Sequence, residues 1–237
     1  MYDALELTKV VRKEVCKCWQ GKFLAKYYRF RATRFYGGCA TADISGCNLR
    51  CGYCWSSNVV WRNLGKFCEP EFVAQRLNEI ALRNGFRYCR ISGGEPTICK
   101  EHLLEVIKRI NRGLIFILET NGILLGEDES FVVKLREFPN LHVRVSLKGA
   151  NEEMFSKVTK AHPENFRLQL AALRHLKRWK ISFHPAILID LYTEGLLEEL
   201  KQRLAEIDRT LPARLDHEFL IKFPHVVKRM KEYGLLP

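Results

Sequence analysis

Two kinds of segment alternate along most of the chain: short apolar runs, and longer segments in which apolar residues recur at helical spacing. Short apolar runs rich in β-branched and aromatic residues predict buried strands. These runs lie at 39–45, 87–92, 114–119, 141–147, 181–189 and 215–221. Amphipathic segments with apolar residues at helical spacing lie between them. Strands that alternate with helices predict a parallel sheet with right-handed crossover connections.

The number of strand–helix units indicates what kind of sheet to expect. The helices are predicted at 69–84, 101–112, 129–137, 151–159, 164–178, 194–209 and 225–233. A closed barrel of this type takes eight strands, so six strands predict an open α/β fold, a partial (β/α)6 TIM-like barrel. We expect this domain to cover residues 37–237. Active sites in such folds lie at the carboxyl ends of the strands.

The first 36 residues follow a different pattern and predict a basic, helical N-terminal extension. Apolar residues among charges over 4–27 indicate one helix. Residues 1–35 hold nine Lys and Arg against three Asp and Glu, a surplus of six, while the whole chain carries +12. Such an extension can bind nucleic acid through phosphate contacts, with Arg29, Arg31 and Arg34 as candidates. The alternative is a solvated helix face on a basic protein.

The stretch CNLRCGYCW (47–55) carries the strongest chemical signal. It places Cys47, Cys51 and Cys54 on the spacing C-x3-C-x2-C directly after the first strand of the predicted barrel. Three thiolates on one loop can hold three irons of a cubane iron–sulfur cluster and leave the fourth open, as catalytic metal centres do. A mononuclear zinc site is the alternative, with Cys39 or Cys68 as its fourth ligand.

Two motifs together resemble the radical S-adenosylmethionine (SAM) superfamily. One is the cysteine loop, with the aromatic Tyr53 before its third cysteine, and the other is SGGEPT (92–97) at the end of the second barrel strand. The resemblance covers nearly the whole chain and is nearest to the glycyl-radical (pyruvate formate-lyase) activating enzymes. It implies a [4Fe–4S] cluster on the three cysteines, with SAM bound at the open iron. It also implies reductive cleavage of SAM to a 5′-deoxyadenosyl radical that abstracts hydrogen from a substrate.

The same resemblance assigns contacts to SAM. Glu95 is expected to accept a hydrogen bond from the methionine ammonium, and the glycines before it let the backbone approach a ligand closely. LETNG (118–122) resembles the DTNG stretch of the activating enzymes. Ser146 stands where those enzymes have an aspartate, and Lys148 is expected to meet the SAM carboxylate or the substrate. The expected contacts are Tyr53, Gly93, Gly94, Glu95, Thr120, Asn121, Ser146 and Lys148.

The cysteines outside the loop are interpreted as ordinary thiols. The chain has nine cysteines, no N-terminal stretch like a signal peptide and no apolar run that could span a bilayer. A cytoplasmic protein with metal or redox chemistry is therefore expected, rather than disulfides. Cys89 is expected in the core, and Cys99 near the GGEPT loop or in plain packing. The alternative is an auxiliary cluster on Cys16, Cys18, Cys39 and Cys68.

Three functional hypotheses follow. A radical enzyme acting on a protein substrate is the first, through the resemblance to activating enzymes. An enzyme that modifies RNA is the second, because C-Y-C-W also resembles the cysteine loop of the wybutosine-forming tRNA enzymes and the charge fits. A non-catalytic electron-transfer iron–sulfur protein is the third, although it would have no use for GGEPT. SAM and a reductant protein are the expected partners, with no membrane contact.

Overall fold

The computed structural model describes residues 1–236, and the strands of this part of the chain form one open nine-stranded sheet. Its order is β1-β2-β3-β5-β6-β7-β8-β9, and β4 pairs with β2 beside this path. The six strands from β3 to β9 in this order run parallel, which confirms the predicted partial barrel. The strands are β1 (Cys16–Trp19), β2 (Lys22–Thr33), β3 (Cys39–Ile44), β4 (Lys66–Cys68), β5 (Tyr88–Gly93), β6 (Ile115–Thr120), β7 (Leu141–Leu147), β8 (Ser182–Leu188) and β9 (Asp216–Glu218).

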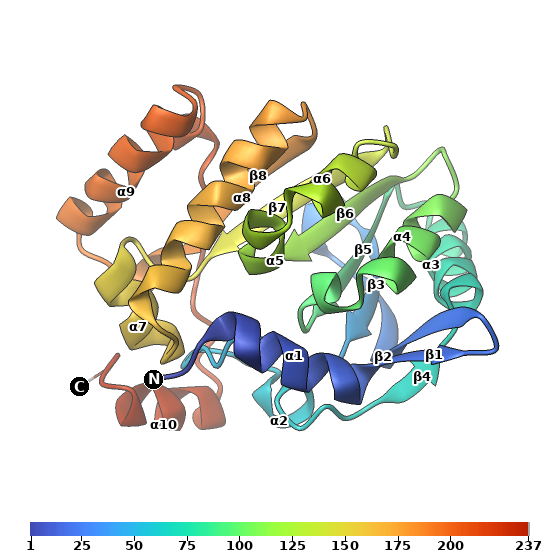
Figure 1. Cartoon of the computed structure of the whole chain (residues 1–237), viewed down its shortest axis with the longest axis horizontal. Coiled ribbons are helices and arrows are strands. Elements are labelled where there is room, and N and C mark those ends of the chain that lie inside the picture. Colours follow the sequence, from blue (N-terminus) through green and yellow to red (C-terminus); the bar gives the residue numbers. More distant parts are fainter. Residues whose placement is uncertain (237) are drawn as a thin grey trace.

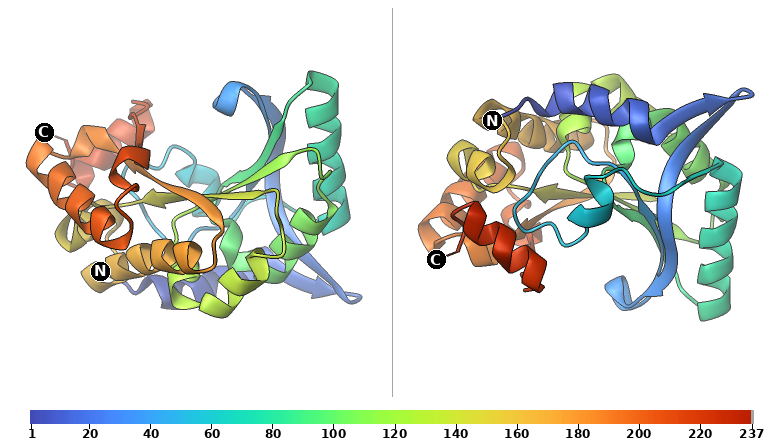
Figure 2. Two further views of the ribbon diagram at one scale, coloured as in Figure 1. Left: turned by 90° about the horizontal axis from the view of Figure 1, so that it is seen from above. Right: turned by 90° about the horizontal axis from the view of Figure 1, so that it is seen from below.

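Helices connect the parallel strands and cover the outer side of the curved sheet (Figures 1 and 2). They are α1 (Ala4–Val15), α2 (Ser57–Val60), α3 (Pro70–Asn84), α4 (Lys100–Arg109), α5 (Ile123–Glu127), α6 (Glu129–Leu135), α7 (Glu152–Thr159), α8 (Phe166–Arg178), α9 (Glu194–Ile207) and α10 (Pro224–Glu232). Over residues 1–236, no helix has both the length and the apolar character needed to cross a membrane.

The two sides of the parallel sheet differ in polarity. Ile91 and Val143 are fully buried in the hydrophobic core between the sheet and the helices. Their neighbours Arg90 and Arg144 point to the opposite, inner side, because successive side chains of a strand alternate. There Arg90 Nε donates to Thr41 Oγ1 at 3.1 Å. The inner side is thus lined by polar groups that a bound molecule can reach.

The predicted helix over 4–27 is wrong beyond Val15. α1 ends there, and β1 and β2 form an antiparallel hairpin that turns at Gln20 and Gly21, with φ of 49° and 75°. Residues 16–33 include a period-two alternation that fits a half-exposed ladder, and Gly21 readily takes the positive φ that interrupts a helix. The hairpin joins the barrel sheet, since β2 pairs with β3. The domain boundary between residues 36 and 37 stays a prediction.

A disulfide joins Cys16 to Cys99 and corrects the expectation that these two residues are ordinary thiols. It connects the start of β1 to the 3-10 helix Pro96–Cys99, which begins within the GGEPT stretch, across a sequence separation of 83 residues. Cys16 is therefore not available for an auxiliary cluster. The pairing depends on how α1 lies against the barrel, which no local pattern encodes. The free cysteines are Cys18, Cys39, Cys47, Cys51, Cys54, Cys68 and Cys89.

Replacing both Cys16 and Cys99 by serine is expected to lower the free energy of unfolding by about 2–5 kcal/mol. The bond closes a long loop, so its loss returns conformational freedom to the unfolded chain. Urea unfolding followed by circular dichroism measures the change. Cys18→Ser, at an exposed free thiol, is the control and should change stability by less than about 0.5 kcal/mol. Equal unfolding midpoints for the double variant and oxidised wild type would contradict this role.

Candidate active site

A cavity of about 480 Å³ opens where the parallel strands end. Its wall comes from the loop after β3, from β5 and β6 with the loops that follow them, and from β7 and β9. The eleven residues expected from the sequence to form the site all line it, although they come from four separate parts of the chain. They are Cys47, Cys51, Tyr53, Cys54, Gly93, Gly94, Glu95, Thr120, Asn121, Ser146 and Lys148.

The cysteine loop brings three free thiols to this cavity. Leu49 N lies 3.4 Å from Cys47 Sγ and donates to it, and Cys54 N donates to Cys51 O at 3.0 Å. Burial raises the pKa of Cys51 to about 12, and the pKa of Cys47 rises for the same reason. Buried thiols of this kind ionise when a metal centre compensates their charge. Cys47 and Cys51 therefore stay neutral until a bound metal centre compensates the thiolate charge.

This donor set fits a cluster better than a single ion. Across residues 1–236, no group of three or more His, Cys, Asp or Glu side chains is arranged to hold one metal ion. Cys39 and Cys68, the fourth ligands that a zinc site would need, are absent from the cavity wall in the described part of the chain. A cubane instead bonds each cysteine sulfur through a different iron, so the sulfurs need not converge on one point. The structure gives the zinc alternative no support.

The C-terminal helix α10 holds the cysteine loop from outside, beside it in Figure 2. Arg229 Nε donates to Gly52 O at 2.8 Å, and a second guanidinium nitrogen donates to Cys54 O. The third nitrogen donates to Ser57 Oγ at 2.7 Å, and the guanidinium lies 4.9 Å from the centroid of the Trp61 ring. Arg229 was not among the residues predicted from the sequence, because nothing local links residue 229 to this loop.

Arg229→Met is expected to lower the free energy of unfolding by about 2–3 kcal/mol, because buried carbonyls lose a charged donor. The apo protein should also show faster amide hydrogen exchange in the segment 47–57, measured by mass spectrometry. Lys228→Met removes the same charge from an exposed neighbour on α10 and serves as control. Equal exchange in the two variants would show that Arg229 does not order the loop.

Glu95 is a buried carboxylate, 2% exposed, fixed by four donors. Its Oε1 accepts from Thr97 N at 3.2 Å, from Thr97 Oγ1 at 2.6 Å and from Thr120 Oγ1 at 2.7 Å. Its Oε2 accepts from Asn121 N at 2.7 Å and keeps capacity for a further donor. Burial raises the pKa of Glu95. A cation that enters the cavity would be met by an oriented acceptor whose charge is poorly solvated.

Gly94 brings the SGGEPT loop against the cysteine loop. A Cβ at Gly94 would lie 2.2 Å from Gly46 O and 2.8 Å from Ile44 O, a clash that only glycine avoids. Gly94 N donates to Ile44 O at 2.8 Å, and Glu95 N to Gly46 O at 2.7 Å. The sequence interpretation expected these glycines to approach a ligand. At Gly94 the close approach is to the protein's own backbone, and it sets Glu95 beside the cysteines.

A network of side-chain amides connects three further predicted contacts, Asn121, Ser146 and Lys148. Asn121 Nδ2 donates to Asn48 Oδ1 at 2.7 Å, next to Cys47 in the sequence. Gln169 of α8 donates to Asn121 O and, at 3.2 Å, to Ser146 O, and it accepts from Lys148 N at 2.9 Å. Gln169 is fully buried and ties the ends of β6 and β7 together. Sequence reasoning missed it, because a single Gln in an amphipathic helix has no distinctive pattern.

The cavity wall also contains two ion-pair groups that sequence reasoning missed. In the first, Glu119 pairs with Arg90 at 2.5 Å and accepts from Tyr36 and Ser92 hydroxyls at 2.8 and 2.6 Å. In the second, the buried Arg144 pairs with two carboxylates of β9 at 2.7 and 2.6 Å. Their signal was available, since an arginine inside an otherwise apolar strand must face a polar partner. The β9 carboxylates are Asp216 and Glu218.

Three free cysteines and one buried glutamate meet in a single cavity at the strand ends of an open α/β barrel, the place where proteins of this architecture bind their ligands. The chain belongs to the Radical SAM superfamily, whose model matches residues 43–204. It is therefore a radical SAM enzyme, of a family that uses a [4Fe–4S] cluster and SAM. This confirms the resemblance inferred from the two motifs, at the level of the superfamily.

Curated relatives are named GTP 3′,8-cyclase. The probable enzyme of Methanocaldococcus jannaschii is 34% identical over 116 residues, which is 48% of this chain and 37% of the relative. The enzyme of Synechocystis is 24% identical over 203 residues, which is 81% of this chain and 61% of the relative. The chain thus spans about a third to three fifths of the length of these two proteins.

Solved structures share the fold at low identity. Streptococcus suis SuiB bound to S-adenosylmethionine has a TM-score of 0.59 at 16% identity, over 82% of this chain and 42% of that one. TYW1 with a lysine-pyruvate adduct has a TM-score of 0.55 at 16% identity, over 97% of this chain and 88% of that one. At such identities the likeness shows the fold alone.

Proposed function

We propose that Cys47, Cys51 and Cys54 hold the [4Fe–4S] cluster and that SAM binds beside it against Glu95. When bound, the cluster and SAM supply an adenosyl radical through one-electron cleavage of a carbon–sulfur bond, and this radical removes a hydrogen atom from the substrate. What supports the assignment is the meeting of three unpaired thiols with one oriented carboxylate in a single cavity. The cavity wall limits the access of water to the reacting groups.

The roles of the other residues follow from their positions. Glu95 accepts from the methionine ammonium through Oε2, the oxygen with free capacity. Lys148 lines the cavity with its ammonium 5.6 Å from the Tyr53 ring centroid, where it can meet a carboxylate. Tyr53 has a buried hydroxyl without a hydrogen-bond partner in residues 1–236, so it can bond a ligand at no desolvation cost. Thr120 and Asn121 orient Glu95, and Ser146 borders the substrate side.

We propose a nucleotide as the substrate. The curated relatives are named for a reaction of GTP, which favours a nucleotide over the protein substrate of an activating enzyme. The cavity suits a purine, because Phe35 and Tyr36 offer rings for stacking and Asp216 and Glu218 offer acceptors for exocyclic N–H groups. The electron-transfer hypothesis finds no role for the Glu95 site, while a reductant protein remains a predicted partner.

Substrate stimulation of SAM cleavage tests the nucleotide proposal. Reconstituted protein with dithionite should form 5′-deoxyadenosine at least about tenfold faster when the true substrate class is added, since substrate binding excludes water and aligns the radical. Ribonucleoside triphosphates, mixed RNA and a mixed peptide library are compared by liquid chromatography. Stimulation by peptides alone would overturn the proposal and favour the activating-enzyme hypothesis. Stimulation by RNA but not by free nucleotides would retain a nucleotide substrate in polymer form.

A further inference from the structure

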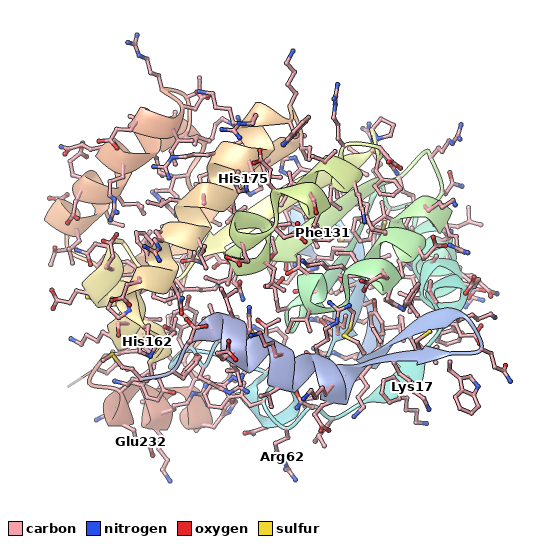
Figure 3. The ribbon with its side chains drawn as sticks, in the orientation of Figure 1. Lys17, Arg62, Phe131, His162, His175 and Glu232 are labelled. Atoms are coloured by element: carbon pink, nitrogen blue, oxygen red, sulfur yellow. A yellow bond between two sulfur atoms is a disulfide. The ribbon has the colours of Figure 1, made fainter. Side chains whose placement is uncertain are left out.

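The hairpin carries aromatic rings and lysines on one exposed face. In the pairing register, Trp19 lies opposite Lys22, Lys17 opposite Leu24, and Lys26 opposite Phe67 of β4, which places these side chains on one face of the ladder. The Lys17 ammonium lies 4.5 Å from the Trp19 ring centroid, and Lys26 lies 5.1 Å from that of Phe67. Trp19 and Phe67 are 56% and 39% exposed. Lys17 extends from this end of the molecule in Figure 3.

The same arrangement recurs further along β2. Tyr27 pairs with Ile44 and Arg29 with Asp43, so a bulge at residue 28 moves Arg29 to the face of Lys26. Beyond this bulge, the guanidinium groups of Arg29 and Arg31 lie 5.7 and 5.9 Å from the ring centroid of Trp55. Trp55 stands at the rim of the active-site cavity and is 40% exposed. Cations and rings therefore follow one face of the strand.

The row ends at a residue of the cavity wall, beside the start of β3, because Thr33 at the end of β2 pairs with Cys39. Phe35, two residues after β2, is 54% exposed, lines the cavity and has the Arg90 guanidinium 4.1 Å from its ring centroid. β2 has 12 residues and spans roughly 40 Å at the usual rise of a strand. Figure 2 shows it as a long curved strand that runs away from the protruding hairpin. We name this row of side chains the β2 track: Lys17, Trp19, Lys26, Phe67, Arg29, Arg31, Trp55 and Phe35.

We infer that the β2 track binds single-stranded RNA and leads one of its nucleotides into the active-site cavity. Exposed rings give bases a stacking surface that accepts any sequence, while interleaved lysines and arginines meet the phosphates. This inference rests on the proposed nucleotide substrate and states that the nucleotide is presented within a polymer. An acidic protein would pair with the cations but would have no need of the aromatic rings. The rings therefore favour RNA over an acidic protein as the partner.

The positive charges of the β2 track are not equally free to meet a phosphate, which changes the expectation that its arginines are the main contacts. Arg29 and Arg31 both bond the buried Asp43, at 2.6 and 2.8 Å, so together they present about one unbalanced charge. Lys17 and Lys26 have no carboxylate partner within residues 1–236. The unbalanced positive charge of the track therefore lies mainly on Lys17 and Lys26 of the hairpin. Arg29 and Arg31, which the sequence suggested as phosphate contacts, contribute less.

Fluorescence anisotropy with a labelled oligouridine of about 15 nucleotides tests the track on the full chain, without SAM or reductant. Lys17→Gln with Lys26→Gln should weaken binding and flatten the log–log salt dependence by about 1.4 units, or about 0.7 per lost phosphate contact. Trp19→Ala with Phe67→Ala should lower affinity at fixed salt by about tenfold or more with little change in slope. Melting curves establish that each variant is folded.

The control is Lys134→Gln with Arg136→Gln, which removes two exposed positive charges at the end of α6, on the helical layer. It should leave affinity within about twofold of wild type. Equal losses in the control and the lysine variant would overturn the track, because bulk charge would then explain binding. Loss in the lysine variant with no effect of the aromatic variant, together with competition by poly-L-glutamate, would assign the face to an acidic protein.

The two proposals fail separately. If RNA does not bind to the β2 track, the proposal of a nucleotide substrate still stands or falls on whether free ribonucleoside triphosphates stimulate SAM cleavage. Conversely, strong track-dependent RNA binding without any stimulation of SAM cleavage would contradict RNA as the substrate of this cavity.

Discussion

Replacing Cys47, Cys51 and Cys54 together by alanine is expected to reduce bound iron from about four per chain to none. The three thiols are the free cysteines of the cavity wall in the described part of the chain, so their removal would leave the proposed cluster without protein ligands. Elemental analysis after anaerobic reconstitution measures the iron. The brown colour and the absorption of the cluster should disappear with it.

A matched triple variant makes this result specific. Cys18, Cys39 and Cys68 are also free thiols but lie outside the cavity wall. Their replacement by alanine should leave about four irons per chain, because none of them contacts the site. If the loop variant retained full iron, or if the control variant lost it, the assignment of the cluster to the cysteine loop would be wrong.

Glu95→Gln is expected to weaken SAM binding by about 10- to 150-fold, which corresponds to the roughly 1.5–3 kcal/mol of a hydrogen bond to a charged group. The amide keeps the shape of the side chain but loses the negative charge that, in the proposed site, faces the methionine ammonium. It also turns one oxygen into a donor toward groups that already donate. Equilibrium dialysis with labelled SAM measures the change. Glu137→Gln, which removes the same charge from an exposed position outside the cavity wall, is the control with an expected change under about threefold.

The pH dependence gives Glu95 a second signature. Burial raises its pKa, so protonation begins at a higher pH than for an ordinary glutamate. Because protonation removes the charge that attracts the ammonium, SAM affinity should fall as pH is lowered through this raised pKa. Glu95→Gln should abolish that part of the pH dependence. A fall in affinity that persists unchanged in the variant would assign it to another group.

The barrel and its site could be predicted from the sequence because their signals are local. Each parallel strand is a short apolar run, and the carboxyl ends of such strands meet at one edge, so motifs placed after β3, β5, β6 and β7 had to come together. The hairpin was missed for the opposite reason. The alternating segment is short and comes directly after α1. A helical pattern fitted to all of 4–27 therefore includes these strand residues in the predicted helix.

Contacts between distant segments were beyond local patterns. Arg229 reaches the cysteine loop over 175 residues, and Gln169 reaches Asn121 over 48. The disulfide between Cys16 and Cys99 is of the same kind. Arg90 and Arg144 form an intermediate case, since a charge within an apolar strand predicts a polar inner face but does not name its partner.

Formation of 5′-deoxyadenosine by the reduced, reconstituted chain is the most direct test of a radical SAM site at this cavity. Wild-type protein with dithionite and SAM should release 5′-deoxyadenosine and methionine in equal amounts, slowly even without substrate. The Cys47, Cys51 and Cys54 variant should release neither, and Glu95→Gln should require a higher SAM concentration. Release of S-adenosylhomocysteine alone, or equal 5′-deoxyadenosine from wild type and the cysteine variant, would contradict the assignment.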